Sequence, residues 1–326
     1  MTGTTAPGSA ITTAPSVQAG ASSSASHGAT ILGVEGLSLS PDERAFLCEA
    51  DPWGFILFAR NVDNPDQLRR LTSDLRAAVG RDAIVMVDQE GGRVQRLRHR
   101  LMGQELRAVG IDADAAPCLD VADEATHPFL RNRCFGTDAE TVALMGRAAA
   151  EGLLAAGVLP IVKHMPGHGR TRVDSHHDLP VLDVGLDDLD GSDFAPFRAL
   201  NDLPLGMTAH IRLTQLDDRP ATASPAVIRL IRERIGFQGL LMSDDIGMNA
   251  LSGTPAERAG AAIAAGCDLV LACNLTRTEF AQVVEAAARM SPEAQARADA
   301  ALARRGPPDQ ADAADLRAEL AALLAG

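Results

Sequence analysis

The sequence predicts one α/β domain, a (β/α)8 barrel of the TIM type with helices after it and a disordered leader before it. Eight short apolar runs between residues 31 and 271 alternate with helical patterns, which is typical of parallel strands joined by helices. Eight such units favour a closed barrel over an open sheet. No Gly-x-Gly-x-x-Gly motif follows an early strand, which argues against a dinucleotide-binding sheet.

The first half of the barrel has clear element signals. Apolar runs predict its first three strands, at 31–36, 54–58 and 84–87. Ser40 before Pro41 predicts a helix start, and so does Asn64 before Pro65. Residues 1–28 are rich in Thr, Ser, Ala and Gly, which predicts a leader without a core of its own.

The second half is read in the same way. Residues 111–119 predict a fourth strand only weakly. The other strands are predicted at 158–162, 206–210, 240–243 and 268–271, and the helices at 101–109, 138–156, 192–201, 225–235 and 255–265. The Ala-rich segment 277–326 predicts helices packed outside the barrel. We therefore divide the chain into a leader (1–28), a catalytic barrel (29–275) and a C-terminal helical extension (276–326).

Composition excludes several classes of function. The net charge of −13 argues against binding a nucleic-acid backbone, which needs a basic surface. No apolar run reaches the roughly 18 residues that span a bilayer, and the N-terminus lacks a basic start and an apolar core. The five cysteines are odd in number and contain no Cys-x-x-Cys pair, which indicates small buried thiols in a reducing compartment. These features predict a cytoplasmic protein without a nucleic-acid or membrane partner.

The segment 158–180 has the densest chemistry. Its apolar strand ends in Lys163 and His164, a Pro/Gly-rich loop follows, and the segment holds four of the eight histidines of the chain. Asp174 and His176 are two residues apart, so both side chains project to the same side of an extended loop. A carboxylate beside an imidazole fixes its tautomer and favours its charged form, as a proton donor and acceptor requires. The alternative is a turn with an exposed histidine.

Other polar side chains stand at the ends of predicted strands. The carboxyl ends of barrel strands meet at one mouth, so we expect these groups to converge: Asp88, Lys163, His164, His210, Asp244 and Asp245, with Arg133 nearby. A carboxylate fixed there, such as Asp244, can attack a sugar carbon, although a helix cap or turn is the alternative for it. Asp245 is predicted to be a structural hydrogen-bonding acid, and His210 a satisfied core residue.

Two further interpretations of polar groups stay open. The four histidines of 158–180 and Asp174 could bind zinc, but Pro166 and Gly167 interrupt the His164-x3-His168 spacing that a helix face would need. Arg93, Arg96 and Arg98 follow a Gly-Gly turn and are either a solvated charge run or a clamp for a sugar. The scarcity of aromatic residues, with one Trp, no Tyr and nine Phe, favours a short ligand held by polar contacts.

Four segments, in order, resemble the family 3 glycoside hydrolases of the β-N-acetylhexosaminidase type, in particular the bacterial cytoplasmic enzymes of peptidoglycan recycling. They are Gly54-Phe-Ile-Leu-Phe-Ala-Arg-Asn61, Val87-Asp-Gln-Glu-Gly-Gly-Arg-Val-Gln-Arg96, Lys163-His-Met-Pro-Gly-His-Gly169 with Asp174-Ser-His176, and Ser243-Asp-Asp-Ile-Gly-Met248. Met165 stands where Phe or Ile is usual, Gly247 replaces a small polar residue, and the stretch between Arg98 and Leu101 is short for the family.

The resemblance implies a function and roles for single residues. Asp244 corresponds to the nucleophile, His176 to the general acid/base and Asp174 to its dyad partner. The residues that correspond to the N-acetylglucosamine site are Asp88, Arg96, Arg133, Lys163 and His164. The family hydrolyses with retention through a covalent glycosyl-enzyme and implies no metal and no cofactor. The expected partner is a small saccharide or muropeptide that contains N-acetylglucosamine, and we expect a monomer. A phosphorylase and a non-catalytic sugar sensor are the alternatives.

Overall fold

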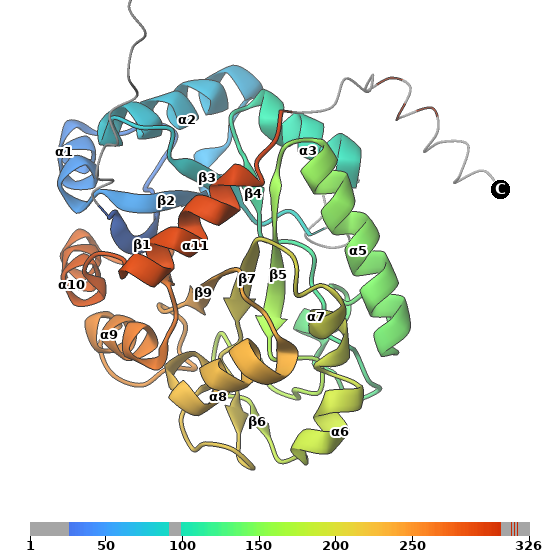
Figure 1. Ribbon diagram of the computed structural model, residues 1–326. Coiled ribbons are helices and arrows are strands. Elements are labelled where there is room, and N and C mark those ends of the chain that lie inside the picture. The colour runs from blue at the N-terminus through green and yellow to red at the C-terminus, as the bar shows by residue number, and fades with distance from the viewer. Residues whose placement is uncertain (1–25, 91–98, 308–313, 315, 317, 319–326) are drawn as a thin grey trace, which may run out of the picture.

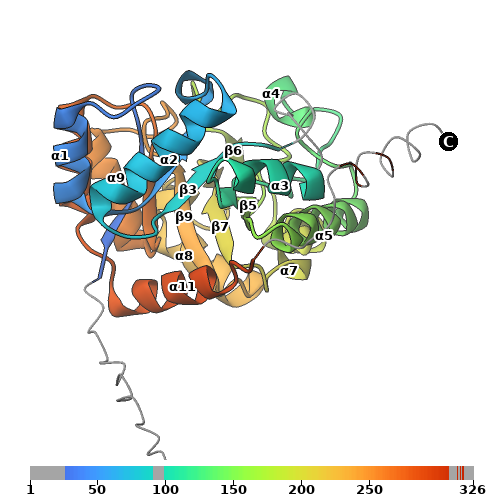
Figure 2. The ribbon, with the colours of Figure 1, turned by 90° about the horizontal axis from the view of Figure 1, so that it is seen from above.

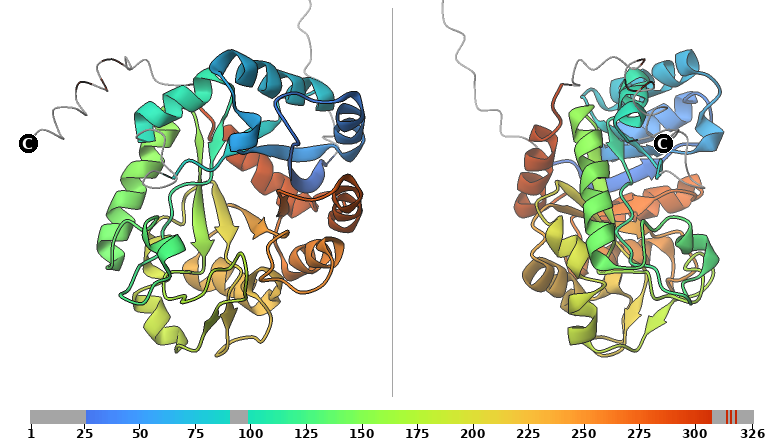
Figure 3. Two further views of the ribbon diagram at one scale, coloured as in Figure 1. Left: turned by 180° about the vertical axis from the view of Figure 1, so that it is seen from behind. Right: turned by 90° about the vertical axis from the view of Figure 1, so that its right-hand side faces the viewer.

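Eight parallel strands close into a barrel in the order β1-β10-β9-β7-β5-β4-β3-β2. The computed structural model describes residues 26–90, 99–307, 314, 316 and 318. Helices surround the strands on all sides (Figure 1, Figure 3). The predicted (β/α)8 barrel is therefore confirmed. The leader predicted at 1–28 lies mostly outside the described residues. Its predicted end at residue 28 is too late, because Gly28 is the first residue of β1 and donates from its N–H to the Asp51 carbonyl.

Each of the eight predicted strands is found. The barrel strands are β1 (Gly28–Gly33), β2 (Pro52–Leu57), β3 (Ile84–Val87), β4 (Ala113–Asp114), β5 (Leu159–Met165), β7 (Leu205–Thr208), β9 (Leu240–Asp245) and β10 (Leu269–Ala272). A separate two-stranded sheet, β6 (Val181–Leu182) with β8 (Arg212–Leu213), was not predicted, because two-residue strands give no periodic signal.

Helices follow the barrel strands. They are α1 (Pro41–Ala50), α2 (Pro65–Val79), α3 (His99–Ala108), α4 (Pro128–Arg131), α5 (Ala139–Ala155), α6 (Leu186–Gly191), α7 (Ala195–Ala199), α8 (Pro225–Leu230), α9 (Pro255–Ala265), α10 (Arg277–Ala287) and α11 (Pro292–Ala303), with single turns at Ala59–Asn61, Ala221–Ala223 and Ile231–Ile235. The predicted caps are confirmed: the Ser40 hydroxyl accepts from the Glu43 N–H at 3.1 Å, and the Asn64 amide oxygen accepts from Gln67 at 3.0 Å. None of the described helices is both long and apolar enough to cross a membrane.

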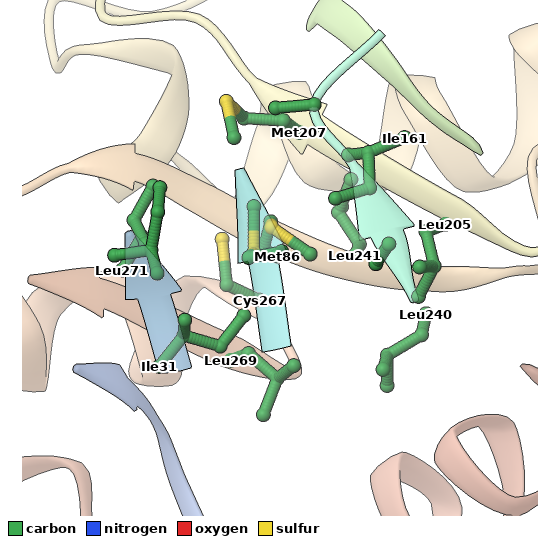
Figure 4. Close-up of a cluster of buried hydrophobic side chains, with 14 of the residues drawn as sticks. Ile31, Met86, Ile161, Leu205, Met207, Leu240, Leu241, Cys267, Leu269 and Leu271 are labelled. Atoms are coloured by element: carbon green, nitrogen blue, oxygen red, sulfur yellow. The ribbon is translucent and has the colours of Figure 1, made fainter. Parts of the chain in front are cut away.

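The core fills the inside of the barrel. Figure 4 shows side chains from several strands, among them Ile31, Met86, Ile161 and Leu241, gathered in one cluster, and all four are at most 1% exposed. Strands that are covered on both faces need no polar alternation, which explains the continuous apolar runs of the sequence. The five cysteines are free and three are buried, but Cys48 is exposed on α1, so the prediction of buried thiols is wrong there.

Helix α11 lies across the amino-terminal ends of the strands, whereas α4 lies at the opposite end (Figure 2). From α11, Arg297 donates to Asp268, which precedes β10. Arg305, just after α11, pairs with Asp112, which precedes β4. Helix α10 packs on α9 and β1. The proposed division of the chain at residue 276 stays a prediction.

We expect Asp112→Ala to destabilise the barrel. The Asp112 side chain is fully buried and forms ion pairs with Arg76 at 3.1 Å, with Arg107 at 3.6 Å and with Arg305. The side chains of these three arginines are 18–28% exposed. Removal of Asp112 leaves Arg107 without this anion and leaves Arg76 and Arg305 with only the more exposed Asp82. The free energy of unfolding should fall by about 3 kcal/mol. Urea unfolding measures this. The control Asp66→Ala removes a surface ion pair with Arg69 and should change the free energy of unfolding by less than about 1 kcal/mol.

Candidate active site

A cavity of about 170 Å³ opens at the carboxyl ends of the strands. That is below the roughly 300–1,000 Å³ of drug-sized ligand sites and suits a single small ring. Its lining includes every predicted site residue that the structure describes except Asp174: Asp88, Arg133, Lys163, His164, His176 and Asp244, together with Asp245, Phe58, Phe129, His168, Ser175, Met207, Met248, Leu271, Cys273 and Asn274. Arg93, Arg96 and Arg98 lie outside the described residues.

Asp244 is a half-buried carboxylate near the end of β9. Its Oδ1 accepts from the Asp245 N–H at 2.8 Å. Burial alone raises the pKa of Asp244, but the nearby imidazoles of His210 and His164, this hydrogen bond and the Lys163 ammonium lower it below its ordinary value. The helix-cap alternative fails, because Thr254 caps the next helix, α9. The side chain is therefore an anion inside the cavity.

Asp174 and His176 form a pair on the loop after β5, but the segment is a turn and not the extended loop that was predicted: the Asp174 carbonyl accepts from the N–H groups of His177 and Asp178, and His176 is exposed. Asp174 Oδ1 accepts from His176 Nδ1 at 2.6 Å and from its backbone N–H at 2.9 Å. Burial raises the pKa of Asp174, yet these bonds and the charge of the imidazole give a net lowering. Because Nδ1 is engaged, Nε2 is the nitrogen left for a ligand.

Glu90 organises the cationic side of the cavity. Its carboxylate accepts two hydrogen bonds of 2.6 Å from Arg133 and lies 2.5 Å from the Lys163 ammonium, which also bonds Asp88 at 2.7 Å. Burial raises the pKa of Glu90, but the Lys163 and Arg133 charges outweigh it and hold the pKa far below its usual range. Glu90 lies in one of the four segments that carry the family resemblance, but no role was predicted for it. Its position two residues after Asp88, in the segment that follows β3, was the available signal.

Asp120 organises the histidine side. Its Oδ2 accepts from His164 Nδ1 at 2.7 Å and from the Cys118 thiol at 3.2 Å, and its Oδ1 accepts from the His168 N–H at 2.6 Å. Although burial opposes it, the two imidazoles lower the pKa of Asp120 to about 2. Arg133 can only donate and lies 3.3 Å from His164 Nε2, so this nitrogen accepts and Nδ1 carries the hydrogen. Asp120 was not predicted as a site residue, because it follows the weakly predicted fourth strand.

The predicted histidine set for zinc is not assembled. Among the described residues, the three metal-ligand atoms found within 4.8 Å of one another belong to Cys118, Asp120 and His164. These atoms already bond one another, with Asp120 as the shared acceptor. A cation there would break both bonds and would stand close to Arg133.

His210 and Asp245 have the structural roles that were predicted. His210 is fully buried, with Nδ1 2.8 Å from the Thr222 hydroxyl and Nε2 3.0 Å from the Asp245 carbonyl. Asp245 Oδ1 accepts from the N–H groups of Gly247 and Cys273 at 3.0 and 3.1 Å. These bonds fix the turn that follows Asp244.

His168 should make the stability of the protein depend on pH. Burial lowers the pKa of His168 to about 4 against the pull of Asp120. The unfolded chain binds this proton near pH 6.5, so stability falls as the pH drops from about 6.5 to 4, by up to about 3 kcal/mol. Urea unfolding at pH 7 and 4.5 should show a smaller fall for His168→Gln than for the native chain. Equal falls would contradict this assignment.

Comparisons with known proteins point to one family. Residues 99–305 match the model of the glycosyl hydrolase family 3 N terminal domain. A β-hexosaminidase of Methylococcus capsulatus is 39% identical over 283 residues, which cover 77% of this chain and 84% of that protein. A family 3 β-N-acetylglucosaminidase from Paenibacillus is 32% identical with a TM-score of 0.78, and the match covers 87% of this chain and 63% of that one. NagZ from Neisseria gonorrhoeae, in complex with N-trifluoroacetyl-D-glucosamine, is 30% identical with a TM-score of 0.70, and the match covers 86% of this chain and 97% of that one.

Proposed function

Because the chain belongs to glycosyl hydrolase family 3 and is a β-N-acetylhexosaminidase, we propose that it removes terminal N-acetylglucosamine, with retention, from short peptidoglycan-derived fragments. The proposal includes a cytoplasmic location, action as a monomer and catalysis by Asp244 and His176. One observation carries the catalytic part. The anionic Asp244 and the carboxylate-bound imidazole of His176 line the same cavity.

The first step forms a covalent glycosyl-enzyme. An Asp244 oxygen attacks the anomeric carbon while protonated His176 gives the proton of Nε2 to the glycosidic oxygen, and the bond from that carbon to the leaving alcohol breaks. A neutral imidazole remains, and the Asp174 carboxylate at 2.6 Å holds its Nδ1–H. A histidine in this role avoids the repulsion that a second carboxylate would suffer beside Asp244.

The second step releases the sugar. His176 Nε2 takes a proton from water, the water oxygen attacks the anomeric carbon, and the ester bond to Asp244 breaks. The imidazole is then protonated again and the carboxylate is free. Both groups return to their starting states, so no cofactor enters the balance.

The cavity wall supports a single neutral sugar as the bound unit. Asp88 is the more exposed partner of the buried Lys163, with 37% of its side chain exposed, and both line the cavity. Carboxylate and ammonium groups at its wall can accept from and donate to hydroxyl groups. The Neisseria relative was solved with an N-acylated glucosamine, which supports the same sugar here.

An assay of two parts tests the proposal. The enzyme should release 4-nitrophenol from the N-acetyl-β-glucosaminide, and proton NMR should show the β anomer of N-acetylglucosamine first, without added phosphate. Release that depends on phosphate and gives a sugar 1-phosphate would show the phosphorylase alternative. No release from a folded protein that binds the sugar would show the sensor alternative. A digest of anhydromuropeptides tests the aglycone.

A further inference from the structure

Ser175 is the one buried residue of the Asp174-Ser175-His176 triplet. It is 1% exposed, whereas 57% of the His176 side chain and 22% of the Asp174 side chain are exposed. The preceding residues, Arg172 and Val173, are also exposed. Ser175 is therefore the place where this segment enters the protein interior.

The hydroxyl of Ser175 lies 3.2 Å from His168 Nε2. The direction of this hydrogen bond follows from the other side of the ring. The Thr171 hydroxyl donates to the His168 carbonyl at 2.8 Å, so its oxygen is the acceptor 2.6 Å from His168 Nδ1. Nδ1 carries the hydrogen, Nε2 has a free lone pair, and Ser175 is the donor.

His168 is itself tied to the barrel. Its backbone N–H donates to the buried Asp120 at 2.6 Å, and the residue is 1% exposed. The Phe129 ring packs edge-on against both His168 and His176, with centroid distances of 5.7 and 5.8 Å. One aromatic ring thus contacts both the anchor and the catalytic imidazole.

We propose that the Ser175–His168 hydrogen bond is a latch that holds the Asp174–His176 dyad at the cavity, which makes Ser175 a positioning residue for proton transfer. The inference rests on the proposed role of His176 as acid/base. Ser175 is adjacent to both dyad residues, so an anchor at this point fixes the backbone that carries them. Loss of the latch leaves Asp244 unchanged and lets the dyad move away from the glycosidic oxygen.

The choice of leaving group separates this role from a merely structural one. A poor leaving group needs the proton of His176 and a good one does not. Ser175→Ala should lower kcat/KM about 10- to 100-fold for di-N-acetylchitobiose, the size expected for one lost hydrogen bond. For the 2,4-dinitrophenyl N-acetyl-β-glucosaminide the loss should be less than about threefold. The control Val173→Ala, an exposed residue of the same loop, should leave both values unchanged.

Two further variants complete the test. In a His168→Leu background, Ser175→Ala should add no further loss on di-N-acetylchitobiose, because the bond is already absent. Equal losses of Ser175→Ala on both substrates, or no loss on either, would overturn the latch. His176→Ala should show a larger dependence on the leaving group than Ser175→Ala. If the activity of His176→Ala does not depend on the leaving group, the proposed acid/base is wrong. If the activity of His176→Ala depends on the leaving group and that of Ser175→Ala does not, only the latch is wrong.

Discussion

Asp244→Asn should lower kcat on the 4-nitrophenyl N-acetyl-β-glucosaminide by a factor on the order of 10⁴ to 10⁶, as loss of a catalytic nucleophile does elsewhere. The amide has the same shape and can still accept from the Asp245 N–H, so the fold should be kept. It cannot form the ester with the anomeric carbon. Steady-state kinetics at saturating substrate, with a thermal melt to verify folding, measures the effect.

The neighbouring carboxylate is a matched control for this prediction. Asp245→Asn keeps an oxygen that can accept from Gly247 and Cys273. Burial, with the charge of Asp244, raises the pKa of Asp245, so its surroundings favour the charged carboxylate less than they do at Asp244. We expect a loss of less than about tenfold. The assignment of Asp244 as nucleophile would be contradicted by a folded Asp244→Asn enzyme with substantial activity, or by a larger loss of kcat for Asp245→Asn than for Asp244→Asn.

Glu90→Gln should weaken both the fold and the binding of substrate. Glu90 is the shared anion of Arg133 and Lys163, and all three side chains are at most 13% exposed. An amide removes the charge that compensates these two cations, so the free energy of unfolding should fall by about 3 kcal/mol. Urea unfolding measures this part of the prediction.

The kinetic effect of the same substitution has a separate readout. Arg133 and Lys163 line the cavity, and without Glu90 their side chains are no longer fixed for the sugar. We expect kcat/KM to fall by about 10²-fold, as a small misplacement of positioning groups does elsewhere. Asp202→Asn weakens a more exposed pair with Arg147 and should change stability by less than about 1 kcal/mol and leave kinetics unchanged. A Glu90→Gln protein as stable and active as the native one would contradict the role of Glu90.

The site could be predicted as far as strand ends could be read. Asp88, Lys163 and Asp244 each follow or end a run of apolar residues, and the barrel brings such positions to one mouth. Glu90 and Asp120 were missed for one physical reason. Glu90 acts on Arg133 and Asp120 acts on His164, which lie 43 and 44 residues away in the chain, so no local pattern shows which groups these acids compensate.

The sequence by itself determined the eight strand–helix units, two of the helix caps and the adjacency of Asp174 and His176. These features depend on interactions within a few residues, namely periodic burial, side-chain capping and the two-residue separation of Asp174 and His176. Only the tertiary structure decided which acids compensate Lys163, Arg133 and His164, and that Ser175 rather than a dyad residue is anchored in the interior. A buried charge must be compensated by whichever groups the closed barrel brings against it, and those groups come from different strand ends.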